Sequence, residues 1–178
     1  AQALGYAEAD PTADVEGFDA MYKNSILSSL AYKKRVPVDK IYREGISGIA
    51  VEDINYGKEL GYTIKLLAIS KNRDGKIEAR VHPAFLPSGH PLSSVSGSFN
   101  AVYVHGDSVD DIMLYGRGAG ALPTGSAIVS DVIYAATHAD HKYASFKNTL
   151  LPEKGVKFAT DSKSRYYIRF TAKDRAGV

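Results

Sequence analysis

The chain has 178 residues, of which 44% are apolar and 24% charged, with a net charge of +2 and no cysteine. This length suffices for one well-filled core but falls short of two full domains, and no apolar run approaches the roughly 20 residues that span a membrane. The composition also offers no basic block interleaved with aromatic residues to favour nucleic acid, and without cysteine the chain has no disulfides, thiolate metal sites or cysteine nucleophiles.

The first predicted element is a helix over residues 14–33, where apolar residues recur at near-helical spacing and the first turn is acidic. In such a helix, Asp19 and Lys23 project from one face about one turn apart. The two groups are then close enough to share a proton or a substrate hydroxyl. From spacing alone, a surface ion pair worth roughly 0.3–0.5 kcal/mol is the commoner interpretation. Glu8 precedes the helix, and either adds a carboxylate to the same pocket or is an ordinary helix-entry carboxylate.

A second helix is predicted over residues 51–60, ended by Gly61. Branched and aromatic residues then predict four strands, at 62–70, 77–85, 99–105 and 111–115. The Asp74-Gly75 pair between the first two favours a hairpin turn. The four strands together indicate a mainly antiparallel or mixed sheet.

Three glycines at alternate positions, Gly116, Gly118 and Gly120, precede a helix that is expected to begin at Pro123-Thr124 and to be largely buried. A glycine turn before a helix presents backbone N–H groups to an anion or lets a flat cofactor ring approach closely. A simple strand-to-helix turn explains the same pattern, so the glycines alone do not decide.

The histidines do not form a metal-binding pattern. His82 and His90 each precede a proline, which favours extended backbone, and neither shares its pattern with a carboxylate or cysteine. His138 and His141 lie three residues apart and are best interpreted as a solvated helix end. We therefore predict no metal site.

Residues 142–164 are polar and lysine-rich and are expected to be a connector. Residues 165–170 alternate like a strand and lead into Asp174-Arg175-Ala176-Gly177-Val178. Helix-rich blocks on either side of the strands predict an α+β fold, with a mixed, mainly antiparallel sheet and helices packed on one face. The other sheet face requires a partner.

Several stretches share their order and spacing with one enzyme family. They are GYAEADPTADVEGFDAMYK at residues 5–23, Glu44-Gly45-Ile46, Arg80-Val81-His82-Pro83, His90-Pro91-Leu92 and the glycine motif ending at Gly120. Together they resemble homoserine dehydrogenases. This resemblance implies interconversion of L-aspartate 4-semialdehyde and L-homoserine with NAD or NADP. It further implies that Glu8 and Asp19 bind the substrate, that Lys23 with Asp19 is catalytic, and that Gly118 and Gly120 lie against the cofactor.

The resemblance also implies a domain plan. Residues 1–141 match the substrate, catalytic and dimerisation domain, 142–164 a linker, and 165–178 the start of an ACT-like regulatory domain, because that tail resembles the first strand and loop of ACT domains. No glycine fingerprint of a nucleotide-binding domain is present. We therefore expect a fragment, inactive by itself, whose cofactor is bound mainly by a separate N-terminal domain.

The family further implies a cytoplasmic homodimer in threonine, methionine and isoleucine biosynthesis, with threonine regulation through the ACT domain. Two alternatives remain open at this point. One is a non-catalytic dimerisation module, and the other is a related oxidoreductase acting on another small amino-acid aldehyde. Preference for NAD or NADP, and fusion to an aspartate kinase, do not follow from these residues.

Overall fold

The computed structural model describes residues 9–138, 156–159 and 161–173. The elements in chain order are α1 (Thr12–Val15), α2 (Phe18–Tyr32), the 3-10 turn η2 (Val38–Lys40), β1 (Tyr42–Arg43), α3 (Val51–Glu59), β2 (Tyr62–Arg73), β3 (Lys76–Pro87), the 3-10 turn η3 (Pro91–Ser94), β4 (Phe99–Gly106), β5 (Asp110–Arg117), α4 (Ala121–Thr137) and β6 (Lys157–Phe158).

The first predicted helix is divided in two, so the expectation of one continuous helix from residue 14 was wrong. α1 ends before Gly17, whose φ of +76° belongs to the left-handed region that favours glycine. A Cβ on Gly17 would lie 3.1 Å from Val81 Cγ1. The break therefore lets the chain turn sharply against β3, and α2 begins immediately afterwards.

The centre of the fold is the long hairpin of β2 and β3, paired antiparallel from Tyr62–Pro87 to Arg73–Lys76. Asp74 and Gly75 both have positive φ at its tip, which confirms the predicted turn. β1 and β6 pair parallel with the free edge of β3 at different heights. β6 was not expected, because it lies in a segment whose polarity predicts a connector.

The four predicted strands all form, but they do not make one sheet. β4 and β5 pair only with each other among the described residues, as a separate antiparallel hairpin. A mixed sheet and an antiparallel hairpin therefore replace the single sheet that the sequence indicated. The physical reason is that alternation predicts strands and their faces but carries little information about pairing between hairpins.

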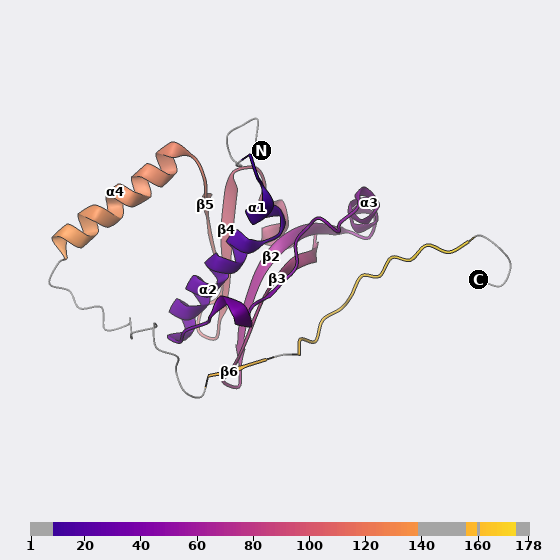
Figure 1. Cartoon of the computed structure of the whole chain (residues 1–178), viewed down its shortest axis with the longest axis horizontal. Helices are drawn as coiled ribbons and strands as arrows, with labels where there is room; N and C mark the ends of the chain where they lie inside the picture. Colours follow the sequence, from indigo (N-terminus) through magenta and orange to yellow (C-terminus); the bar gives the residue numbers. More distant parts are fainter. Residues whose placement is uncertain (1–8, 139–155, 160, 174–178) are drawn as a thin grey trace.

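Helices α2 and α3 cover one face of the β2–β3 hairpin, as predicted (Figure 1). Beneath α2 lies the main apolar core, made of Met21, Val36, Ile41, Ile77, Ala79 and Val81. α3 begins and ends close to its predicted bounds, and Gly61, with a φ of +79°, follows its last turn. Buried Gly57 brings α3 against Phe85, since a Cβ there would lie 3.1 Å from the Phe85 ring.

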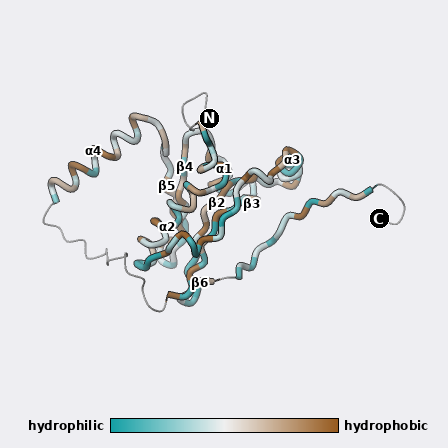
Figure 2. Tube along the Cα trace, in the orientation of Figure 1, coloured by the Kyte–Doolittle hydropathy of each residue, from teal (hydrophilic) through white to brown (hydrophobic). Residues whose placement is uncertain are grey.

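Helix α4 differs most from expectation. It was predicted to be largely buried, yet it extends away from the sheet and buries no residue within the described structure (Figure 1). Its apolar side chains, such as Leu122 and Val132, are 87% and 62% exposed, and Figure 2 shows apolar residues along it. The sequence predicted an apolar helix correctly, but apolar composition does not say what covers it. In the part of the chain described, no helix is both long and apolar enough to cross a bilayer.

Candidate active site

The predicted carboxylate and amine meet on the first turns of α2. Lys23 Nζ lies 2.5 Å from Asp19 Oδ2, an ion pair one helical turn apart. Their side chains are 61% and 46% exposed, respectively, so both are open to a small molecule. The expected shared face of the helix is therefore observed, although α2 begins later than predicted.

The start of α2 is fastened by the segment that follows β1. The Ile46 N–H donates to the carbonyl of Val15 at 2.8 Å, and the Ser47 hydroxyl donates to Glu16 Oε1 at 2.7 Å. A Cβ on Gly45 would lie 2.7 Å from both Glu16 Cα and the Val15 carbonyl oxygen. Only glycine fits at this crossing, which fixes the α1–α2 turn and hence the position of Asp19.

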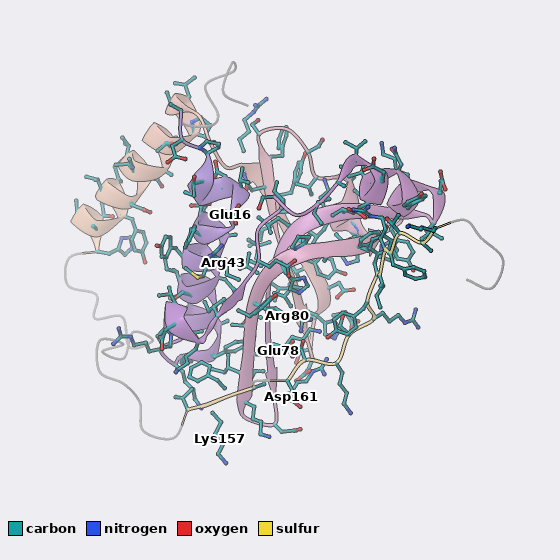
Figure 3. All side chains as sticks on the ribbon, turned by 45° about the vertical axis from the view of Figure 1, so that its right-hand side comes forward. Glu16, Arg43, Glu78, Arg80, Lys157 and Asp161 are labelled. Atoms are coloured by element: carbon teal, nitrogen blue, oxygen red, sulfur yellow. The ribbon has the colours of Figure 1, made fainter. Side chains whose placement is uncertain are left out.

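Arg43 reinforces the same turn. Its guanidinium lies 3.7 Å from the ring centre of Phe18, the first residue of α2. Arg43 Nη1 donates to the Glu16 carbonyl and is 3.9 Å from Glu16 Oε2, and Figure 3 labels both residues beside α2. A guanidinium over an aromatic face is held by cation–π attraction. Arg43 was not predicted from the sequence, because a single arginine in a short strand carries no distinctive pattern.

Buried polar contacts hold the middle of α2 on the sheet. Asn24 Nδ2 donates at 3.3 Å to the carbonyls of Ile69 on β2 and Arg80 on β3, and the Ser28 hydroxyl donates to Asn24 Oδ1 at 2.9 Å. Arg80 also forms a part-buried ion pair with Glu78, two residues before it on the same strand (Figure 3). The buried Asn24 amide favours one arrangement, because shifting the helix would leave it unpaired.

The glycine motif forms the turn between β5 and α4. Gly118 N–H donates to the carbonyl of Ser98 at 3.1 Å, and a Cβ on Gly118 would collide with the Asn100 side chain. Gly120 has a φ of +118° and directly precedes α4. Both Gly118 and Gly120 are exposed. The backbone conformation at Gly120 therefore favours glycine, and a Cβ at Gly118 would have to displace the exposed Asn100 side chain. The turn presents bare backbone at the start of a helix.

The structure thus brings Asp19 together with Lys23, and Gly118 together with Gly120. The start of α2 and the glycine turn both lie in the upper half of the molecule in Figures 1 and 3. Glu8 lies outside the described residues, so its predicted place beside Asp19 stays a prediction.

Two of the histidines that were considered as metal ligands make local contacts through Nδ1. His82 Nδ1 lies 2.7 Å from the carbonyl oxygen of Pro83, and His90 Nδ1 accepts from Leu92 N–H at 3.1 Å. Within residues 9–138, 156–159 and 161–173, no three His, Cys, Asp or Glu side chains gather as a metal site would require. His141 lies outside these ranges.

Comparison with known proteins gives a consistent result. The family model described as homoserine dehydrogenase matches residues 1–133. The homoserine dehydrogenase of Corynebacterium glutamicum is 46% identical over 180 residues, covering 98% of this chain and 40% of that protein. The chain therefore spans about two fifths of the length of such relatives.

Solved structures agree with the sequence relatives. The crystal structure of a homoserine dehydrogenase from Thiobacillus denitrificans is 41% identical with a TM-score of 0.78, over 89% of this chain and 38% of that one. A hyperthermophilic archaeal homoserine dehydrogenase mutant, in complex with NADPH, is 32% identical with a TM-score of 0.61, over 76% of this chain and 38% of that one.

Proposed function

Because this chain belongs to the homoserine dehydrogenase family, we propose that it supplies the substrate-binding and catalytic part of an enzyme that interconverts L-aspartate 4-semialdehyde and L-homoserine with NAD or NADP. The observation that carries the proposal is the exposed Asp19–Lys23 pair at the fixed start of α2. Its residues lie within the part of the chain that the family model matches.

In the reducing direction, the aldehyde carbon receives a hydride and the carbonyl oxygen requires a proton. Lys23 has the chemistry for the second task, since a protonated amine donates a proton and stabilises negative charge developing on that oxygen. Asp19 orients the Lys23 ammonium through their ion pair. Glu8 holds the ammonium group of the substrate by a charge-assisted hydrogen bond, which directs the reacting carbon toward the cofactor.

The glycine turn suits a nicotinamide cofactor. Its two glycines leave exposed backbone without side chains at the start of α4, where a flat ring can lie close. When bound, NAD(P) supplies or accepts the hydride. A relative in complex with NADPH supports this choice of cofactor. Gly118 and Gly120 are the residues of this chain that would contact it.

The finer features of the family belong to the same proposal. Residues 1–141 act as the substrate domain, 142–164 as a linker, and 165–178 as the first part of an ACT-like domain that responds to threonine. Two subunits form a homodimer in the cytoplasm. Exposed apolar side chains on the β4–β5 hairpin, including Val104, Ile112 and Leu114, support a subunit contact. A monomeric mass by sedimentation at micromolar concentration contradicts the homodimer.

The test of the reaction uses the complete parent enzyme and follows homoserine-dependent reduction of NAD(P) by absorbance. Lys23→Ala is expected to lower kcat on the order of 100-fold or more, because a positioned proton donor contributes about that much. Lys58→Ala removes an exposed lysine from α3 and is the matched control. Glu8→Gln is expected mainly to raise KM. Unchanged turnover in Lys23→Ala rejects the assigned role, and a parent without homoserine oxidation rejects the function.

A further inference from the structure

The C-terminal segment, defined as residues 165–171, is attached to the domain through one buried carboxylate. Arg169 Nε donates to Asp53 Oδ1 at 2.7 Å and Arg169 Nη2 to Asp53 Oδ2 at 3.3 Å, while the Tyr167 hydroxyl donates to Oδ1 at 3.0 Å. Asp53 is only 5% exposed. A bidentate arginine pair on a buried carboxylate is among the stronger polar contacts that a protein makes.

The same carboxylate also closes the first turn of α3. Asp53 is the third residue of that helix, and its Oδ2 accepts the Ala50 N–H at 2.8 Å. Hydrogen bonds from Arg169 and then from Ala50 hold the pKa of Asp53 below its ordinary value. One side chain therefore joins two structures that are more than 100 residues apart in sequence.

An aromatic contact gives the segment a second attachment, on β3. The ring of Tyr167 stacks on Phe85 with centroids 4.6 Å apart and planes inclined by 28°. Phe85 in turn lies against Gly57 of α3. The neighbouring side chains Tyr166 and Ile168 are 76% and 74% exposed, so only one side of the segment is docked. An open groove of about 660 Å³ remains between α3 and the segment.

Strand β3 connects this docking surface with the base of α2. Val81 precedes Phe85 by four residues, a separation of about 13 Å along a strand. Val81 Cγ1 packs against the position of Gly17, the turn before α2, and the Val81 carbonyl accepts the Glu44 N–H at 2.8 Å. Strand β3 thus carries the contact with Tyr167 at Phe85 and, four residues earlier, the contact with the turn before α2 at Val81.

We propose that the C-terminal segment, which also opens the proposed ACT-like domain, is a latch seated on Asp53 and Phe85, and that its seating holds the first turn of α3 and the part of β3 that packs against the turn before α2. The occupant of this surface is the chain's own segment. Withdrawal of the segment removes three hydrogen bonds from a buried carboxylate and one ring from Phe85. An effect of the latch on catalysis at Asp19 and Lys23 rests on the proposed function. The coupling between the C-terminal segment and the start of α2 does not.

The test is amide hydrogen exchange of the complete parent enzyme followed by mass spectrometry. Arg169→Met removes both guanidinium contacts while keeping an apolar stem. It is expected to speed exchange in residues 165–171, in the first turn of α3 and in residues 17–21, on the order of threefold to tenfold in the directly attached regions. Arg165→Met is the matched control, because no ion pair of Arg165 is found in the described part of the chain. It should leave all three regions unchanged.

Faster exchange in residues 165–171 alone overturns the coupling, and equal effects of the two arginine variants overturn the role of Asp53. Tyr167→Phe provides an independent check, because it removes one donor and retains the stacked ring. It is expected to loosen the same regions less than Arg169→Met does. Hydrogen exchange does not depend on catalysis. Loss of the proposed activity, or failure of the role assigned to Lys23, would therefore leave this result unaffected.

Discussion

Replacing Gly45 by alanine tests the packing that fixes the start of α2. The added methyl group would lie 2.6 Å from Glu16 Oε2 and 2.7 Å from Glu16 Cα and the Val15 carbonyl oxygen. The carboxylate oxygen is the end of a side chain and can rotate away. The other two atoms belong to the backbone of the α1–α2 turn, so relief requires one of the two segments to move.

The expected cost follows from that geometry. Overpacking by one methyl group typically destabilises by about 1–3 kcal/mol, and backbone contacts on a fixed turn place this substitution toward the upper end. For a chain of this length, 1 kcal/mol shifts Tm by about 2–4 °C. Gly45→Ala should therefore lower Tm by roughly 6–12 °C. In the complete enzyme it should also lower kcat/KM, because Asp19 and Lys23 begin the displaced helix.

Gly48→Ala is the control in the same loop. Gly48 does not have positive φ, and a Cβ there would meet nothing within 4 Å. Its substitution should change stability by less than about 0.5 kcal/mol. A slight stabilisation is also consistent, because alanine reduces the conformational entropy of the unfolded chain. Thermal unfolding followed by circular dichroism measures both variants. Equal Tm values for the two variants would refute the argument that Gly45 sits at a backbone crossing.

Three further predictions concern single residues. Because the folded pKa of Asp53 is lowered, its stabilising contribution is complete above its ordinary pKa near 3.8 and is lost as pH falls through the lower folded value. Chemical unfolding between pH 7 and 3 should show that the free energy of unfolding falls less with pH in Arg169→Met than in the unchanged protein. Asn24→Ala should destabilise by about 1–3 kcal/mol in urea, whereas exposed Asn55→Ala should not. Gly118→Ala in the parent should weaken NAD(P) binding in a fluorescence titration, and unchanged affinity contradicts a cofactor-facing turn.

Local patterns in the sequence were sufficient for most individual elements. The periodicity of α3 with Gly61 behind it, and the Asp74-Gly75 turn between two branched runs, each specify a structure through contacts only a few residues apart. The Asp19–Lys23 pair belongs to the same class, since helical geometry alone brings residues four apart together.

The fold predictions that were wrong all depend on contacts between residues that are distant in the chain. The break at Gly17 depends on Val81, and the need for glycine at residue 45 depends on Glu16, so neither appears in a local pattern. The same holds for the separate β4–β5 sheet and for the exposure of α4. Short-range patterns were enough to specify most helices and strands and to place Asp19 beside Lys23. The pairing of the strands, the break in the first helix and the contact of Asp53 with the C-terminal segment depend on long-range packing, which no short window of residues contains.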